Sequence, residues 1–558
     1  MLVGRATVLG ALFATVLLAT APPAWAHAEL ESTSPSPSSV LLETPRQVVL
    51  RFDEAVTIDF GSMSVLALDG RRVDEGGARH PGGEGSVVAT SLAGPLPKGT
   101  YVVAWRVVSD DGHPVHGAYV FSVGSAAGIG RAERVATSLA AEGGSTAVGA
   151  VYGVLRAVVF AALLLLVGAG AALLLAPWLL ALRRVRRLLW TAWATLGVAT
   201  VLGIGVQGAY AAALPLSHAA SPSSVRAVLH TRFGEVQLLR LVLLAGVAVV
   251  LRGLGRPGPA GRRWRLAVGI PLALGLLLTP GLAGHASTLG NGVVGETIDV
   301  VHLAAASLWV GGLALLGVLV LHGQTRRERA GETAALARRF SVVAASSVVV
   351  LVTSGTLQSL RRVGSTYALF HTSYGRILLV KIGLLAGLVA VAAITRRRVV
   401  GGWISSGRRL RAVDGRATPP PVALAGELAL LAAIVVATSL LVNTVPARQA
   451  AAQPFTASFD VLGLQLNAVV APAQVGPQNQ FHFYVLGSLG QPVAVRELDA
   501  SIALPGRAPR ALTLVVAGPG HYQANTVDLP VAGSWSLTVT MATSPGTERR
   551  LHAVIPVH

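Results

Sequence analysis

Three observations predict a membrane protein with a β-rich domain at each end. Hydrophobic residues make up 52% of the 558-residue chain and charged residues only 13%, the balance of a polytopic membrane protein. Eight apolar runs long enough to cross a bilayer lie between about residues 149 and 445. The flanking regions alternate polar and apolar side chains, as half-buried strands do. The predicted fold class is multidomain: an N-terminal all-β immunoglobulin- or cupredoxin-like sandwich, an eight-helix transmembrane bundle and a small C-terminal β-sandwich.

Residues 1–26 have the pattern of a secretory signal peptide. Arg5 precedes an apolar run, and Ala24-Trp25-Ala26 forms an A-x-A cleavage site. Cleavage after Ala26 would leave His27 as the first residue of the mature protein. An uncleaved anchor helix is the alternative, but the short run and the good cleavage signature favour removal.

Residues 27–124 are predicted to form the N-terminal sandwich, because short β-rich runs alternate there with turn signals. Residues 125–148 are rich in Gly, Ala and Ser and are expected to be a linker. The membrane domain is expected at residues 149–445, and strand-like alternation returns at residues 453–558, where a second outer sandwich is expected. The β-rich runs of the first sandwich lie at residues 48–52, 64–68, 101–105 and 118–121.

The apolar runs are joined by connections of very different charge. Arginines cluster after the first, third, fifth and seventh runs, and the other connections carry far fewer. By the positive-inside rule the arginine-rich connections are cytoplasmic, which places both soluble ends outside. We therefore expect the chain in the cytoplasmic membrane of a bacterium, and we attribute its net charge of +19 to topology rather than to nucleic-acid binding. The runs lie near residues 149–179, 188–213, 235–252, 266–284, 297–321, 340–360, 375–395 and 421–444.

An internal echo occurs at the outer starts of the third and seventh runs. Residues 230–240 and 371–381 share a His, a Thr, an aromatic residue, a Gly, a Leu and a basic residue in register. Both copies enter the membrane in the same direction, which favours parallel repeats of about four helices. A recurring helix-start motif is the alternative.

The candidate metal ligands are nitrogen and oxygen donors, because the chain has no cysteine and only three methionines. This donor set favours Cu(II) or Zn(II) over Cu(I). Asp111 and His113 lie two residues apart, so on an extended segment both side chains point to one face. A free His27 would add its α-amine and ring nitrogen, and together these donors suit the tetragonal geometry of Cu(II).

The stretches His27–Leu30, Leu50–Glu54 and Trp105–Gly117 together resemble the CopC family of periplasmic copper-binding proteins. The resemblance implies a Cu(II) site formed by His27, Asp111 and His113. It implies no Cu(I) site, since the methionine-rich segment of some members has no counterpart. His116 stands where a small polar residue is expected and is a candidate extra ligand.

The membrane domain is similar to the CopD family in three stretches, which are Gly284-His285-Ala286, Asp299–Leu303 and Trp309–Leu313. Since the CopC-like domain precedes the membrane domain in the chain, the domain order is that of CopC–CopD fusions. Residues 453–558 resemble the small YtkA-like domain attached to some of these fusions.

Six ionisable residues near the outer ends of the membrane runs are candidates for a copper pathway. Ionisable groups at membrane depth are costly, so they usually face a bundle interior or a pathway. Three of them recur at every third position of one helix and so share a face. The alternative is that they hydrogen-bond helix ends, with Arg240 or Lys381 neutralising the carboxylates. These residues are Glu296, Asp299, His302, His285, His230 and His371.

The predicted function is capture of Cu(II) outside the cytoplasm and its transfer to the transmembrane domain, for copper uptake, homeostasis or resistance. No G-x-x-x-x-G-K-[ST] motif is present, so ATP-driven pumping is not expected. We expect a binding and transport protein rather than an enzyme, with copper, the lipid bilayer and an extracytoplasmic copper chaperone as candidate partners. Two alternatives stay open: a copper-dependent oxidase or monooxygenase-like enzyme with an N-terminal histidine brace, and a b-type haem cytochrome.

Overall fold

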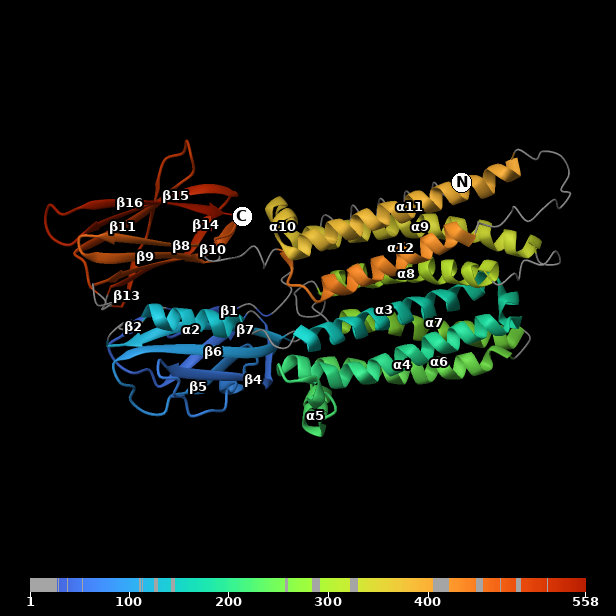
Figure 1. The fold of residues 1–558 in the computed structure, drawn as a ribbon, viewed down its shortest axis with the longest axis horizontal. Coiled ribbons are helices and arrows are strands. Elements are labelled where there is room, and N and C mark those ends of the chain that lie inside the picture. Colours follow the sequence, from blue (N-terminus) through green and yellow to red (C-terminus); the bar gives the residue numbers. More distant parts are fainter. Residues whose placement is uncertain are drawn as a thin grey trace.

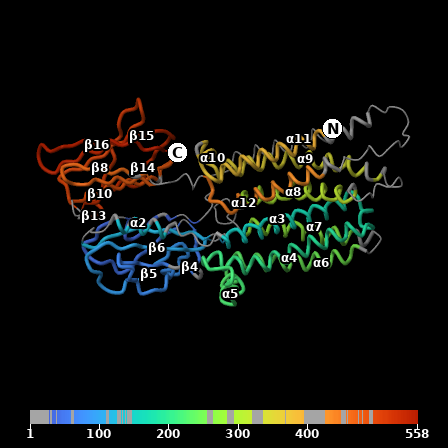
Figure 2. Tube along the Cα trace, viewed as in Figure 1, coloured from blue at the N-terminus to red at the C-terminus, as the bar shows by residue number. Residues whose placement is uncertain are grey.

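Two β-rich domains lie beyond the same end of a bundle of long helices in the computed structural model (Figure 1). The same arrangement is visible along the Cα trace (Figure 2). The structure describes residues 28, 30–37, 39–52, 54–109, 112, 114–124, 129–141, 146–255, 259–283, 292–321, 330–404, 421–447, 455–471, 473–487, 493–518 and 520–557. The predicted signal peptide therefore lies outside the described residues.

The N-terminal domain is a sandwich of two sheets, with strand orders β1-β3-β5 and β2-β7-β6-β4. Its strands alternate buried and exposed positions, as in Gln47–Phe52, and the buried side chains from both sheets form one core. Phe52 and Trp105 meet edge to face in this core, with ring centroids 5.4 Å apart. The strands are β1 (Leu30–Ser34), β2 (Val40–Leu41), β3 (Gln47–Phe52), β4 (Val56–Ala67), β5 (Val87–Ser91), β6 (Gly99–Ser109) and β7 (Pro114–Val123).

The segment expected to be a linker contains a helix, α2 (Ile129–Ala141). Ala132 and Ala136 of α2 are buried against Val102 and Val120 on the outer face of the β6–β7 sheet. The expectation of a plain linker was therefore wrong for this part of residues 125–148. Small alanine side chains, which suggested a flexible segment, instead let the helix lie close to the sheet.

Among the described residues, eight helices are long and apolar enough to cross a membrane, which confirms the predicted spans. Two short helices, α5 (Pro222–Leu229) and α10 (Thr366–His371), join the second and third long helices of each half. The long helices are α3 (Thr146–Leu175), α4 (Arg183–Ala211), α6 (Arg232–Arg252), α7 (Pro259–Leu282), α8 (Gly292–Leu321), α9 (Ala330–Val363), α11 (Ser373–Ile404) and α12 (Pro421–Val442).

The two halves of the bundle repeat the same helix order. Each has two long helices, one short helix and two more long helices. The first helices of the halves, α3 and α8, cross so closely at Gly168 that an added Cβ would lie 1.7 Å from the Ser307 carbonyl oxygen. This order favours the parallel-repeat interpretation of the internal echo.

The residues of the echo form the joint between the short helix and the next long helix. Thr231 Oγ1 accepts from the Gly234 amide at 3.2 Å and donates to the Val228 carbonyl at 2.6 Å. Thr372 Oγ1 makes the equivalent bonds to the Gly375 amide at 3.0 Å and the Ala368 carbonyl at 2.6 Å. A threonine that caps one helix while holding the end of another explains why the motif recurs at both positions.

The C-terminal domain is also built from two antiparallel sheets, with strand orders β13-β14-β10-β9-β8 and β12-β11-β15-β16. Its core contains Phe481 and Phe483 from one sheet and Leu537 and Val539 from the other. The predicted β-rich C-terminal region is confirmed. The strands are β8 (Phe455–Val461), β9 (Leu464–Ala471), β10 (Gly476–Leu486), β11 (Glu497–Ala503), β12 (Arg510–Leu512), β13 (Val515–Gly518), β14 (His521–Leu529), β15 (Gly533–Ala542) and β16 (Arg549–Val557).

Candidate functional site

The turn between β6 and β7 carries two of the predicted metal ligands. Gly112 is its described residue, with a φ of +83° that favours glycine, and its amide donates to the Ser109 carbonyl at 2.8 Å. Asp111 and His113 flank Gly112 in the chain. Like His27, they lie outside the described residues, so their roles as ligands stay predictions.

This turn is seated on the membrane domain. The carbonyl of Gly112 accepts a hydrogen bond from Nε2 of Gln207, near the end of α4. A Cβ added to Gly112 would lie 3.1 Å from that nitrogen and 3.5 Å from the Phe233 ring on α6. A small cavity lies beside the contact, lined by Thr57, Ser109, Gly112, Gln207, Thr231 and Arg232, among others.

Other residues of the Trp105–Gly117 stretch have a structural role. Trp105 on β6 pairs with Gly117 on β7, and a Cβ added to Gly117 would lie 2.7 Å from the indole ring. The glycine thus leaves room for the indole, which is 8% exposed. The packing supports the two strands that carry the turn.

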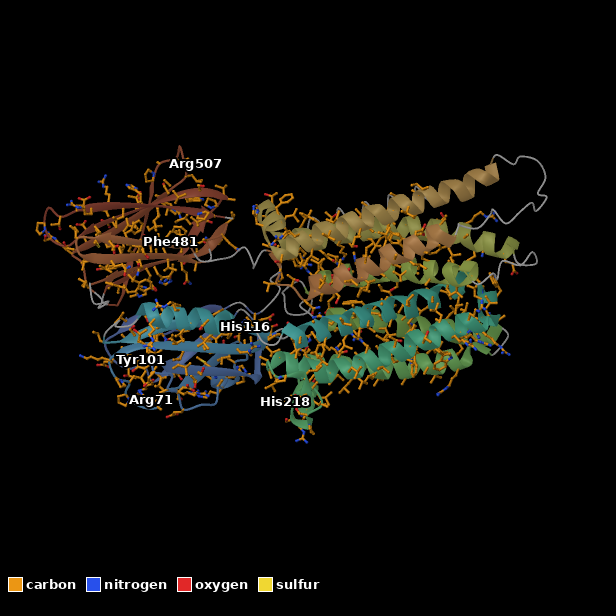
Figure 3. All side chains as sticks on the ribbon, in the orientation of Figure 1. Arg71, Tyr101, His116, His218, Phe481 and Arg507 are labelled. Carbon is orange, nitrogen blue, oxygen red and sulfur yellow. The ribbon has the colours of Figure 1, made fainter. Side chains whose placement is uncertain are left out.

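His116 lies on β7 at the end of the outer domain that faces the helices (Figure 3). Its cross-strand partner is Arg106. Burial lowers the pKa of the Arg106 guanidinium below its ordinary value. A guanidinium in the neighbouring position opposes a second cation, so this pairing weighs against His116 as an extra ligand.

Asp299 and His302 of α8 both face α9. The Gln358 side-chain amide donates to Asp299 Oδ1 at 2.8 Å, and Arg362 Nη2 lies 3.9 Å from Asp299 Oδ2. Arg240 instead donates to Gln237 Oε1 at 2.8 Å and to Thr279 Oγ1 at 2.9 Å. Of the two cations predicted to neutralise the carboxylates, Arg240 therefore bonds to other groups, and the role of Lys381 stays a prediction. The cation that lies beside Asp299 is Arg362.

The hydrogen bonds of Ser354 orient the His302 ring. His302 Nδ1 and Ser354 Oγ lie 2.8 Å apart, and Ser354 Oγ donates to the Val350 carbonyl at 2.6 Å. Since the hydroxyl proton goes to that carbonyl, Oγ accepts from the Nδ1 proton of His302. The other ring nitrogen, Nε2, then carries the lone pair that a metal could bind.

The remaining candidates do not converge with this pair in the described part of the chain. Glu296 lies beside α7, where a Cβ added to Gly281 would be 3.9 Å from its Cγ. His230 and His371 are exposed and end two different short helices, α5 and α10. His285 lies outside the described residues. Across the described ranges, no three His, Asp or Glu side chains gather closely enough to hold a metal.

The residue that sequence reasoning missed is Gln207. Its side chain is 3% exposed, although it is an amide among mostly apolar residues near the end of α4. A glutamine inside a predicted span is itself a signal, because an amide in a membrane helix needs a hydrogen-bond partner. The partner, the Gly112 carbonyl, lies 95 residues away in sequence.

Three protein-family models match the chain. Residues 30–124 match a CopC domain, residues 145–295 match the Copper resistance protein D-like N-terminal domain, and residues 334–441 match Copper resistance protein D. Protein YobA of Escherichia coli K12 is 32% identical over 114 residues, which are 20% of this chain and 92% of YobA. The chain belongs to the copper-resistance family that joins a CopC domain to a CopD domain.

Two further relatives match different extents of this CopC–CopD chain. Copper resistance protein C of Escherichia coli is 36% identical over 110 residues, covering 18% of this chain and 83% of that protein. Copper transport protein CutJ of Bacillus subtilis strain 168 is 28% identical over 537 residues, covering 92% of this chain and 93% of CutJ. The likeness to CutJ thus spans both the CopC and the CopD domains.

Proposed function

We propose that the chain captures Cu(II) outside the cytoplasm with its CopC domain and passes copper to its CopD domain, for copper uptake or resistance. The observation that carries this proposal is the docking of the β6–β7 turn on α4 and α6 through Gly112. The predicted ligands Asp111 and His113 are the chain neighbours of the residue that touches the membrane domain. The names of CutJ, a copper transport protein, and of copper resistance protein C support copper as the cargo.

The proposed capture site consists of the His27 amine and ring, the Asp111 carboxylate and the His113 ring. Cu(II) prefers such nitrogen and oxygen donors in a tetragonal arrangement. The α-amine has an ordinary pKa near ~8, so copper must displace a proton from it. Copper affinity at this site should therefore fall as the solution becomes acidic.

The proposed receiving group in the CopD domain is His302, with Asp299 one turn away. A histidine that ligates a metal commonly donates its other ring proton to a fixed acceptor, and Ser354 is such an acceptor here. The carboxylate of Asp299 is neutralised by Arg362, so an arriving cation would compete with that arginine. Glu296, His285, His230 and His371 stay predictions as further groups of the pathway.

The proposed orientation places both outer domains outside the cytoplasm of a bacterial cell. Its support is the clustering of arginines in the odd-numbered connections, together with the position of both β domains at one end of the bundle. An extracytoplasmic copper chaperone as a partner is part of the same proposal. The oxidase and cytochrome alternatives gain no support, since the relatives are named for copper transport and resistance.

The proposal is tested by electron paramagnetic resonance of Cu(II) bound to the purified full chain. Adding one residue before His27 should weaken Cu(II) binding at least tenfold, and His113→Ala should change the spectrum. His218→Ala is the matched control, because this exposed histidine ends a short 3-10 helix before α5. An unchanged spectrum and affinity in both test variants would overturn the capture site.

A further inference from the structure

Two imidazoles of the C-terminal domain lie against each other, far in sequence from the capture site. His482 on β10 and His521 on β14 come from neighbouring strands, and His482 Nδ1 lies 3.1 Å from His521 Nε2. His521 is 2% exposed, and His482 is half-buried. Without a metal, this spacing is that of a hydrogen bond between the two rings, in which one of the facing nitrogens carries a proton. A metal bound between them would take the place of that proton, which moves to the other nitrogen of its ring.

Strand register places this pair on the face of the sheet opposite to the core. Along β10, Phe481 and Phe483 point into the core, so His482 and Tyr484 point to the other face. The Tyr484 ring stacks on His521, with ring centroids 4.4 Å apart. This stacking and the neighbouring strand hold the His521 ring in place.

The spacing of the two nitrogens suits a shared metal ion. With metal–imidazole bonds of about 2.0–2.1 Å, two ligands in square or tetrahedral geometry have nitrogens about 2.8–3.4 Å apart. The 3.1 Å between His482 Nδ1 and His521 Nε2 falls in this range. The other nitrogen of His482 lies 3.4 Å from Gln480 Oε1, and a proton donated there leaves Nδ1 with a lone pair towards His521.

We propose that His482 and His521 bind a copper ion between them. Imidazole nitrogen suits copper, and copper has the highest affinity of the divalent first-row metals for such donors. The described residues bring no third His, Asp or Glu to the pair, so solvent would complete the coordination and the ion would exchange readily. The site is separate from His27, Asp111 and His113 and does not depend on their role.

Protonation does not compete strongly with copper at this pair. Burial lowers the pKa of His482, and burial together with the neighbouring His482 lowers the pKa of His521 to about 4. Both rings are therefore neutral near neutral pH, which is the form that binds metals.

The pair lies where the two outer domains meet. The hydroxyl of Tyr484 donates to the Pro37 carbonyl of the CopC domain, and Val40 of that domain packs on Leu486. Since Tyr484 also stacks on His521, copper bound at the pair would change the packing of a side chain that joins the two domains. This places a second copper site on the outer side of the protein, beside the domain that captures copper.

The test counts Cu(II) bound by the full chain in detergent on a His113→Ala, His302→Ala background, which removes proposed ligands of the capture site and of the membrane domain. We expect one copper ion per chain at the pair, and at least tenfold weaker binding in His482→Gln and in the His482→Gln, His521→Gln double variant. Glutamine keeps a polar side chain at each position. His552→Gln is the matched control, because His552 is an exposed histidine on the other sheet of the same domain.

Two results would overturn the proposal. The first is the absence of bound copper in the His113→Ala, His302→Ala chain, and the second is equal copper binding with and without His482 on that background. If the double variant does not fold, the single variant His482→Gln is used alone, because it replaces a half-buried side chain and leaves the buried His521 in place. Resistance of residues 455–557 to limited proteolysis confirms that each compared variant is folded.

Discussion

Replacing Gln207 by leucine should separate copper capture from copper transfer. The Gln207 amide is buried and donates to the Gly112 carbonyl, so its loss leaves a desolvated carbonyl at the junction. An unsatisfied buried acceptor costs about 1–3 kcal/mol, which lowers the ratio of docked to undocked turns about 5- to 150-fold. The proposed capture site belongs to the outer domain and should keep its affinity for Cu(II).

The assay combines copper transfer with a direct measure of docking. Because the chain has no cysteine, a single cysteine at Ser109, which is buried beside the junction, reports undocking through its rate of thiol labelling. Gln207→Leu should raise that rate and lower cellular copper uptake several-fold at limiting copper. Thr200→Val is the control, since Thr200 is buried in the same helix and its hydroxyl bonds within that helix, to Leu196.

Equal labelling rates and equal copper transfer in Gln207→Leu and Thr200→Val would show that the Gln207–Gly112 bond does not hold the junction. Loss of Cu(II) binding by the outer domain in Gln207→Leu would also contradict the prediction, because the junction would then be part of the binding site itself.

Three further predictions concern other parts of the chain. His302→Ala should abolish copper transfer while leaving Cu(II) binding by the outer domain intact, and equal transfer would make His302 structural. Ser354→Ala, which frees the His302 ring, should weaken copper binding in the membrane domain by about tenfold or more, measured by Cu titration against the His302→Ala chain. Asp74→Asn should destabilise the first sandwich by about 1–3 kcal/mol, because buried Asp74 accepts from Arg72 and from the Val65 amide. Burial alone would raise the pKa of Asp74, but these bonds lower it overall, so its stabilisation is present above the ordinary pKa and is lost as pH falls through the lowered value. Hydrogen exchange at the Val65 amide checks this, and equal exchange in both chains at neutral pH would contradict it.

The membrane spans were predictable because each is a local property of the chain. Eighteen or more apolar residues in a row suffice to identify a span without knowledge of any contact. The internal echo was predictable as a pattern, but its cause was not. The double hydrogen bonding of Thr231 and Thr372 depends on short helices that the sequence pattern did not separate from the spans.

The contacts between domains were not predictable from local patterns. Gln207 and Gly112 are 95 residues apart, and only the folded chain brings them together. The helix α2 was missed because its alanine-rich sequence suits both a flexible linker and a helix against a sheet. Arg362 as a neighbour of Asp299 was not predictable for the same reason, because only the packing of α8 on α9 brings it there.

The histidine pair was missed because it depends on strand register. His482 and His521 are 39 residues apart and lack the short ligand spacing of a sequence motif. The two rings lie side by side only because β10 and β14 pair in one register, in which Phe483 is opposite Tyr522 and Tyr484 is opposite His521. By contrast, Asp111 and His113 could be singled out from the sequence alone, because two metal-binding residue types stand two positions apart, and their joint role stays a prediction.

Copper content of cells at limiting external copper tests the central claim most directly. Cells that make the full chain should differ in copper content from cells that lack it. His113→Ala should remove that difference while the same amount of protein remains in the membrane. If the His113→Ala chain changes cellular copper as much as the unmodified chain does, capture by the CopC domain does not feed the CopD domain.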